Sequence, residues 1–289
     1  MKAWMVGGDA RSAWAARALE RAGWSVAAFG VPGLPDAAEL GTVFSDGGPA
    51  GRAEAAVPPE VVVLPFPSFA GERVRGGRAL SAAALIEAIA PGTRVFGGRL
   101  GAWRAALAAR GALVFDLYGA EPLTTANAVP TAEGAIALAL DAAPITLHGA
   151  RCLVIGFGRI GKVLAQRLAA LSAQVTVSVR READRGLAEA LGLESEQTGR
   201  YPHGLARYDF VFNTVPAPVF TAEQLRQLSP ACVLIDLSSA PYGIPPEACA
   251  AAGVTCRYAP GLPGKCAPKS AGLLYAQQIL LELESEEPQ

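Results

Sequence analysis

The chain has 289 residues, a formal net charge of −1 and scattered basic residues. This length suits two domains of ordinary size or one large one. The sequence has no basic footprint for nucleic acid or an anionic membrane, and it has no apolar run of the roughly 20 residues that span a bilayer. Because the apolar stretch near the N-terminus is too short for a signal peptide, we expect a cytoplasmic protein.

The metal-binding residue types are sparse. The five cysteines form no CxxC pair, and the two histidines, His148 and His203, have no clustered carboxylates beside them. The odd cysteine count favours reduced thiols, and a zinc or iron site would lack ligands. We therefore expect no metal.

The chain opens with a predicted strand at 3–8, a helix at 11–22 and a strand at 24–29. The turn between the first two reads GGDAR rather than GxGxxG, so it need not hold a nucleotide. Asp9 and Arg11 lie where an open α/β sheet presents ligand groups, at the carboxyl end of a strand. An equally good interpretation is that Asp9 caps the helix and Arg11 is solvated.

Strands and helices alternate through the rest of the first domain. After loops at 31–59 around a weak strand at 42–44, the pattern implies a parallel sheet that is covered on both faces and is flavodoxin-like. The predicted ranges are strands at 61–64, 94–96 and 112–115 and helices at 81–90 and 101–110.

A crossover helix follows the segment TTANAVPTAEG at 124–134 and runs to about Ala143. The sequence predicts Thr131 as its N-cap and Glu133 as an acidic residue in its first turn. The length of this helix suits a connector between two domains.

Residues 151–181 read as a strand, a glycine-rich turn, a helix and a second strand. The apolar run at 152–155 leads directly into GFGRIG, whose glycines permit a tight turn and a close approach of the backbone to a pyrophosphate. In this βαβ context the motif predicts a dinucleotide site. A glycine turn that serves only helix–sheet packing is the alternative, but it explains neither of the two features described next. The predicted contacts are Gly156, Gly158, Arg159, Ile160 and Gly161.

The second strand ends in arginines, where an NAD-preferring site usually carries an Asp or Glu. Ser178, Arg180 and Arg181 occupy this region. A guanidinium pairs with a 2′-phosphate, which would repel a carboxylate, so the sequence predicts NADP in preference to NAD. The alternative is that one or both arginines are solvated at the strand end, and the strictness of the preference stays open.

A third strand, at 209–212, ends in Asn213, Thr214, Val215 and Pro216. In a doubly wound sheet the loop after this strand passes the nicotinamide side of the dinucleotide, so we assign these four residues to the cofactor site. Thr221 and Gln224 form a capping-box signature for the next helix, and strands are predicted at 231–237 and 253–258.

The segment 260–272 is rich in Gly and Pro, so we expect an irregular loop carrying Lys265 and Lys269. A last helix at 273–283 and a frayed acidic tail at 282–289 follow. The fold class is thus α/β, with two doubly wound parallel-sheet, Rossmann-like domains flanking a cleft. Residues 1–125 with the C-terminal helix at 270–289 form the substrate domain, and 126–269 form the NADP-binding Rossmann domain.

Five motifs in this order, GGDAR, NAVPTAEGAI, GFGRIG with its arginine strand end, FNTVP and APGLPGKCAPKSAG, resemble the A-subunit family of bacterial dipicolinate synthase. The architecture is also similar to D-2-hydroxyacid and shikimate dehydrogenases. The resemblance implies an NAD(P)-dependent oxidoreductase that oxidises a dihydropyridine dicarboxylate of the lysine (diaminopimelate) pathway to dipicolinate, the calcium chelator of bacterial spores. NADP would accept the hydride, and a flavoprotein-like B subunit would be the partner.

A dicarboxylate in a cleft needs cations or oriented amides to replace its lost water. The candidate catalytic residues are Glu133, Lys265 and Lys269, and the candidate substrate-binding residues are Asp9, Arg11, Asn127, Thr131 and Ser270. Glu133 ranks first as proton acceptor, with a lysine or water as alternatives. The opposing interpretation is that these lysines and Glu133 are solvated surface charges.

Three other functions stay open. A D-2-hydroxyacid dehydrogenase needs a histidine paired with a carboxylate near the C-terminal loop, where neither histidine lies, and a shikimate-type enzyme needs N-terminal substrate serines that are not matched here. A non-catalytic NADP-binding regulatory subunit would not need the cationic loops. The sequence leaves open whether the chain is a homo-oligomer and whether it is active without the B subunit.

Overall fold

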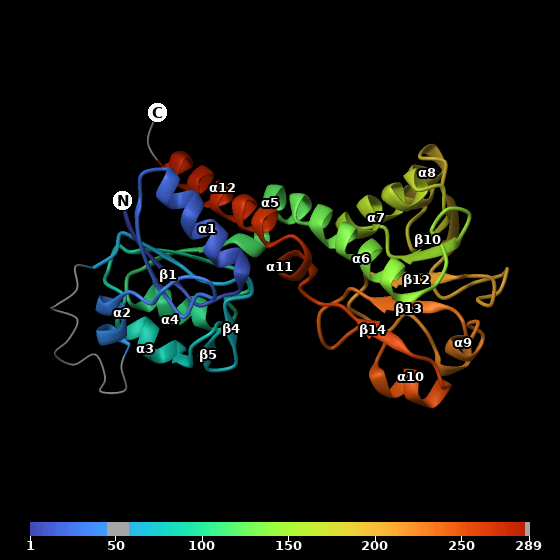
Figure 1. Cartoon of the computed structure of the whole chain (residues 1–289), viewed down its shortest axis with the longest axis horizontal. Helices are drawn as coiled ribbons and strands as arrows, with labels where there is room; N and C mark the ends of the chain where they lie inside the picture. The colour runs from blue at the N-terminus through green and yellow to red at the C-terminus, as the bar shows by residue number, and fades with distance from the viewer. Residues whose placement is uncertain (45–57, 287–289) are drawn as a thin grey trace. The chain divides into compact units, whose positions relative to one another are not determined.

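The computed structural model describes residues 1–44 and 58–286, and the chain divides into two compact units. The first unit comprises Met1–Ala126 together with the segment from Pro268 onward, and the second comprises Asn127–Ala267. Each unit has its own parallel sheet with helices packed against it (Figure 1). Part of the predicted loop, at 45–57, and the end of the predicted tail, at 287–289, lie outside the described residues.

The first unit is built on a five-stranded parallel sheet in the order β2-β1-β3-β7-β8. This is the flavodoxin-like order, in which the direction of winding reverses between the first and the third strand of the sequence. The fold predicted for this part of the chain is therefore confirmed. The strands are β1 (Lys2–Val6), β2 (Ser25–Phe29), β3 (Val61–Val63), β7 (Arg94–Gly97) and β8 (Leu113–Asp116).

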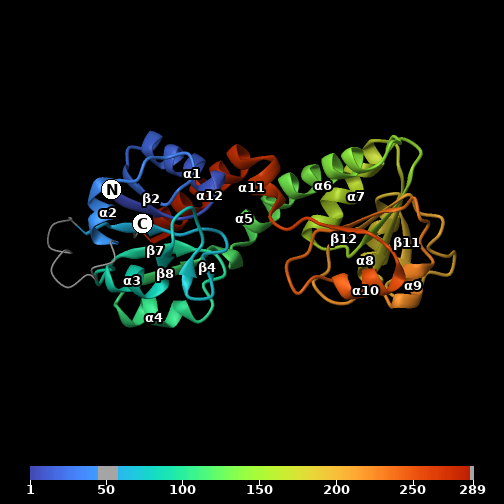
Figure 2. The ribbon, with the colours of Figure 1, turned by 60° about the horizontal axis from the view of Figure 1, so that its bottom comes forward.

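Helices cover both faces of this sheet, and side chains alternate between the two cores. Ala3 and Met5 of β1 pack with α1 and α12, whereas Trp4 and Val6 pack on the other face with α2, α3 and α4 (Figure 2). A strand buried on both faces reads as a continuous apolar run. The helices are α1 (Ala10–Arg21), α2 (Ala38–Val43), α3 (Ala82–Glu87), α4 (Trp103–Ala109), the 3-10 turn η1 (Leu117–Gly119), α5 (Glu121–Ala126) and α12 (Pro268–Glu286).

Two features of the first unit differ from the sequence prediction. The strand expected at 42–44 is wrong, because these residues end helix α2, whose Leu40 and Val43 are buried. A small antiparallel sheet was also missed, since its strands have only two residues each and show no periodicity. They are β4 (Phe69–Ala70), β5 (Arg73–Val74) and β6 (Leu80–Ser81).

The segment after β5 closes the turn that follows β1. The amide of Gly8 donates to the Arg75 carbonyl at 2.7 Å, and a Cβ on Gly76 would lie 2.6 Å from the Gly7 Cα. Backbone thus packs on backbone above the GGD turn. This contact explains why the first unit has a Rossmann-like opening without an open glycine turn for a nucleotide.

The second unit has a six-stranded parallel sheet in the order β11-β10-β9-β12-β13-β14. Numbered within the unit, this is the order 3-2-1-4-5-6 of dinucleotide-binding domains, with the reversal between β9 and β12. The Rossmann prediction is confirmed. The strands are β9 (Arg151–Ile155), β10 (Gln174–Val179), β11 (Glu194–Gln197), β12 (Phe210–Asn213), β13 (Val233–Asp236) and β14 (Cys256–Tyr258).

Two cores again flank this sheet. Cys152 and Val154 of β9 enter one core, and Leu153 and Ile155 enter the other. The helices of the unit are α6 (Ala128–Ala142), α7 (Arg159–Ala170), α8 (Glu182–Ala190), α9 (Ala222–Arg226), α10 (Pro246–Ala252) and α11 (Leu262–Cys266). The capping box predicted for Thr221 and Gln224 is confirmed at the start of α9.

The crossover helix and the C-terminal segment begin earlier than predicted. Thr131 is not an N-cap: α6 starts at Ala128, and the Thr131 hydroxyl donates to the Asn127 carbonyl at 2.8 Å. Glu133 consequently lies in the second turn of α6. The expected loop at 260–272 contains α11 and the start of α12, and 282–286 of the expected tail are helical. No helix within the described ranges is long and apolar enough to cross a membrane.

Candidate functional site

The glycine-rich turn between β9 and α7 gives each of its three glycines a separate task. Gly156 has φ +91°, a conformation that glycine adopts without strain. A Cβ on Gly161 would overlap the Gly156 carbonyl oxygen, whereas a Cβ on Gly158 would meet nothing within 4 Å. Gly156 therefore permits the tight turn, Gly161 permits close packing of the helix on the strand, and Gly158 leaves the backbone open to a pyrophosphate.

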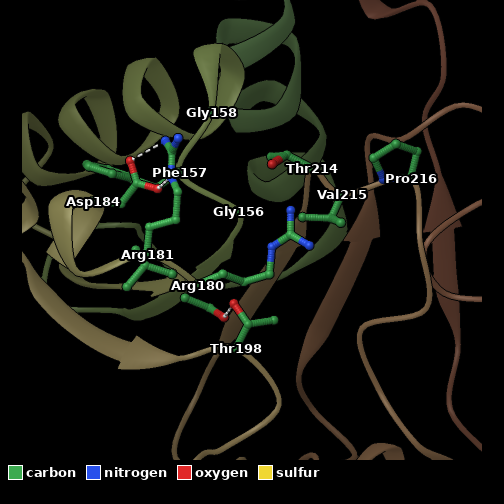
Figure 3. A pocket seen from close by; sticks show the side chains of 12 residues that line it. Gly156, Phe157, Gly158, Arg180, Arg181, Asp184, Thr198, Thr214, Val215 and Pro216 are labelled. Carbon is green, nitrogen blue, oxygen red and sulfur yellow. Dashed lines mark hydrogen bonds and ion pairs between the residues drawn. The ribbon is translucent and has the colours of Figure 1, made fainter.

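A pocket of about 520 Å³ lies beside this turn, at the carboxyl ends of β9, β10 and β12 (Figure 3). Arg159, Ile160 and Gly161 are not part of its wall, because Ile160 packs against the core and Gly161 supports the turn from behind. The wall consists of Gly156, Phe157, Gly158, Ser178, Val179, Arg180, Arg181, Asp184, Thr198, Thr214, Val215 and Pro216.

The two arginines at the end of β10 differ in their availability. Arg181 is held by Asp184, whose carboxylate accepts from Nε at 2.7 Å and from a terminal nitrogen at 2.9 Å. The hydrogen bond from Arg181 lowers the pKa of Asp184. Arg180 is exposed and extends into the pocket, and within the described part of the chain it has no ion-pair or hydrogen-bond partner (Figure 3). Of the two arginines in the described pocket wall, Arg180 is therefore the one available to a ligand, and Arg181 belongs to the start of α8.

Thr198 is a wall residue that the sequence did not indicate. Strand β11 pairs with β10 in register, and the Thr198 amide donates to the Val179 carbonyl at 2.9 Å. The Ser178 hydroxyl then donates to the Thr198 hydroxyl at 2.8 Å. This hydroxyl pair lies next to Arg180, where a carboxylate would stand in an NAD-preferring site.

The last residue of β12 and the three residues after it differ in whether they line the pocket or support it from behind. Thr214, Val215 and Pro216 line the pocket, but Asn213 is fully buried and does not. The Thr214 hydroxyl donates to the Ile155 carbonyl at 2.9 Å, which ties this loop to β9 across the point where the strand order reverses. Ligands of doubly wound sheets bind at this reversal.

Asp9 and Arg11 form a pair within the first unit. The Asp9 carboxylate caps α1 by accepting from the Arg11 amide at 2.9 Å, and it also binds the Arg11 guanidinium at 2.7 Å. Burial raises the pKa of Asp9, but the bonds and charge of Arg11 together outweigh burial and lower it. Arg11 donates further to the Phe66 carbonyl at 2.7 Å, so it bridges the loops after β1 and β3.

The remaining candidate residues are divided between the two units. Lys265 belongs to the second unit, whereas Lys269 and Ser270 belong to the first. Both lysines are exposed, and the Lys269 ammonium lies 5.3 Å from the centroid of the Trp14 ring. Glu133 is exposed on α6 and pairs with Arg167 of α7 at 3.4 Å.

The pocket in the second unit fits a dinucleotide, because Gly158, the glycine of the GFGRIG turn with open space at its Cβ position, lines it, and so does the Arg180 guanidinium, which has no partner among the described residues. Gly156, Gly158 and the N-terminus of α7 would hold the pyrophosphate, and Arg180 with the hydroxyl pair would receive the adenosine ribose. Among the residues that the structure describes, no group of three or more His, Cys, Asp or Glu side chains is arranged for a metal ion.

Comparison with known proteins agrees with this geometry. Residues 113–242 match the NAD-binding domain of D-isomer specific 2-hydroxyacid dehydrogenases. The A subunit of dipicolinate synthase from Bacillus subtilis strain 168 is 33% identical over 174 residues, which make up 59% of this chain and 59% of that relative. The crystal structure of the corresponding A subunit from Bacillus halodurans has a TM-score of 0.83 at 25% identity, over 99% of this chain and 98% of that chain. The chain is similar to the A subunit of dipicolinate synthase, and part of it matches a dehydrogenase NAD-binding domain.

A second crystal structure, of the dipicolinate synthase A subunit from Bacillus subtilis, has a TM-score of 0.80 at 26% identity, over 99% of this chain and 98% of that chain. The resemblance drawn from the five motifs is thus confirmed. The match to an NAD-binding domain also supports a nicotinamide dinucleotide as the cofactor.

Proposed function

We propose that this chain is the A subunit of a dipicolinate synthase and oxidises dihydrodipicolinate, formed from the aldolase product of the lysine pathway, to dipicolinate for bacterial spores. The observation that carries the proposal is the similarity to two dipicolinate synthase A subunits over 99% of the chain, well beyond the dinucleotide-binding domain. The reaction converts dihydrodipicolinate and NADP⁺ into dipicolinate, NADPH and a proton.

We further propose NADP as the preferred cofactor. The support is that Arg180, which lines the pocket, has no hydrogen-bond or ion-pair partner among the described residues, and that the segment 178–181 at the end of β10 contains no Asp or Glu. A guanidinium matches the 2′-phosphate in charge and geometry. With NADP bound in this pocket, its nicotinamide would accept a hydride from the substrate ring. Aromatisation of that ring would drive the transfer.

The two substrate carboxylates require compensating groups as they leave water. Lys265 and Lys269 are the proposed partners because neither forms an ion pair within the described ranges, whereas Arg11 is already neutralised by Asp9. The proposed site also includes Asp9, Arg11, Asn127, Thr131 and Ser270. For the proton acceptor we propose Glu133, a lysine or water. The Glu133 carboxylate already pairs with Arg167, so the experiment below compares Glu133 with the two lysines.

The proposed partner is a flavoprotein-like B subunit, as the resemblance implies. The decisive experiment supplies the aldolase product with NADP to the parent chain, with and without the B subunit, and follows NADPH and the ultraviolet absorbance of dipicolinate. The variants are Lys265→Ala, Lys269→Ala and Glu133→Gln. Lys2→Ala is the matched control, because Lys2 lies at the amino end of β1, whereas Asp9 follows the carboxyl end of the same strand.

Each result has a distinct meaning. If the parent and the B subunit together form no dipicolinate, the proposed reaction is wrong, and a D-2-hydroxyacid or shikimate-type activity or a regulatory NADP-binding role takes its place. If dipicolinate forms but all three variants match Lys2→Ala, the reaction stands and the proposed site is wrong. Full activity of the isolated chain would remove the need for a partner.

A further inference from the structure

Two buried polar side chains meet at the ends of β12 and β13, behind the pocket wall. Asn213 and Asp236 are partners in the register of these strands, and both are fully buried. The Asn213 Nδ2 donates to the Asp236 Oδ1 at 3.0 Å. A buried carboxylate needs further donors, and the amides of Ser238 and Ile244 supply them, each at 2.8 Å.

Asp236 determines which way the Asn213 amide points. A carboxylate only accepts hydrogen bonds, so the Asn213 NH₂ group must face it. The Asn213 Oδ1 then accepts from the Val215 amide at 3.0 Å, and Nδ2 also donates to the Val215 carbonyl at 3.0 Å. One side chain thus holds both backbone groups of Val215, which lines the pocket.

The loop after β13 packs directly on the loop after β12. A Cβ on Gly243 would overlap the Val215 carbonyl oxygen and the Asn213 Nδ2. The Gly243 amide donates to the Ser238 hydroxyl at 2.9 Å, and its carbonyl accepts from the Val219 amide at 3.2 Å. Because no side chain separates the two loops, a shift of one displaces the other.

We propose that Asp236 is a positioning residue for the dinucleotide, which acts through Asn213 to fix Val215 in the pocket wall. In a doubly wound sheet each half of the strands receives one mononucleotide, so the half built on β12, β13 and β14 serves the nicotinamide end. Asp236 therefore sets the wall for the reacting half of the cofactor without touching it. The proposal rests on the cofactor class alone and is independent of the substrate.

The test separates the two halves of the cofactor by binding. The ligands are the dinucleotide, NAD or NADP, that the parent binds more tightly, and the matching fragment without nicotinamide, ADP-ribose or 2′-phospho-ADP-ribose. In Asp236→Asn the new NH₂ group must face the N–H donor of Ile244 or that of Ser238, so the loop after β13 shifts and, through its packing on the loop after β12, displaces Val215. We expect about tenfold weaker binding of the dinucleotide, the loss typical of one charge-assisted hydrogen bond, and less than about a twofold change for the fragment.

Three further variants make the test specific. Gly243→Ala pushes on Val215 from the other loop without changing charge, and it should give the same selective loss. The exchange Asn213→Asp with Asp236→Asn restores one donor–acceptor pair and should recover part of the dinucleotide affinity. Asp209→Asn is the matched control. The Asp209 carboxylate accepts from the Arg151 amide at 2.8 Å, and this bond lies at the amino ends of β9 and β12, whereas Asn213 and Asp236 lie at the carboxyl ends of their strands. The control should lower thermal stability and leave the ratio of the two affinities unchanged.

A purely structural role gives a different pattern. If Asp236→Asn and Gly243→Ala weaken dinucleotide and fragment alike, or change neither, Asp236 does not position the cofactor. If Asp236→Asn does not fold, the affinity ratio in Gly243→Ala decides by the same criterion.

Discussion

Replacing Arg180 should weaken NADP binding, whereas replacing its neighbour Arg181 should not. Arg180 has no partner in the described structure, so its charge is available to a 2′-phosphate at no competing cost. Arg181 would first have to give up two bonds to Asp184. A hydrogen bond to a charged group contributes about 1.5–3 kcal/mol, or about 10- to 150-fold in affinity. Since Arg180 is exposed and screened, we expect the lower end, about tenfold.

The assay is a titration of parent, Arg180→Ala and Arg181→Ala with NADP and with NAD at low and at physiological salt. The loss in Arg180→Ala should be confined to NADP and should shrink as salt rises. Asp184→Asn adds an independent arm, because it releases Arg181 and removes a carboxylate from the pocket, so NADP should bind more tightly. Equal affinities for NADP and NAD in the parent, or equal losses in the two arginine variants, would refute the reasoning.

Three further predictions concern stability. Gly161→Ala places a Cβ on the Gly156 carbonyl oxygen, so we expect a loss of about 1–3 kcal/mol in chemical denaturation together with weaker dinucleotide binding, and an unchanged midpoint would contradict the close packing. The pKa of Asp9 in the folded protein lies below its ordinary value of 3.8, so the ionised Asp9 side chain stabilises the fold fully above pH 3.8, and this stabilisation is lost as the pH falls through the lower folded value. Asp9→Asn should remove this part of the acid dependence, which acid titrations of the parent and the variant would show. Tyr275→Phe removes the hydrogen bond from the buried Tyr275 hydroxyl to the Leu64 carbonyl, 2.7 Å, and should cost about 1–2 kcal/mol, whereas the exposed Tyr118→Phe should cost less than about 0.5 kcal/mol; similar losses in both would count against this bond.

The sequence predicted the sheets well because their central strands are buried on both faces. Residues 152–155 read as one apolar run for this reason, and the glycines of GFGRIG mark where the run must turn. Short elements escaped prediction. Helix α11 begins after Gly261, which is in the left-handed conformation, and carries a proline in its first turn, so its composition resembles that of a loop.

Within the candidate site, local sequence patterns indicated residues that line the pocket, but they did not indicate contacts between strands. The two arginines at the end of β10 were found from their distance to the glycines, but only the structure shows that Asp184 occupies Arg181. Thr198 reaches the pocket through the register of β11 on β10, and Asp236 meets Asn213 through the register of β13 on β12. Pairings of this kind depend on tertiary structure, and no single stretch of sequence contains them.

Helix α12 packs against α1, although the whole dinucleotide-binding unit lies between them in the chain. On the ribosome, the first unit is therefore started first and finished last, because residues 127–267 are made before Pro268 appears. Its core residues Tyr275, Ala276, Ile279 and Leu283 are made after the second unit, so the face of the sheet on which α1 packs stays incompletely covered while the second unit already has its complete sequence. We expect the inserted unit to fold before the unit that contains the N-terminus, which reverses the usual order of synthesis and folding.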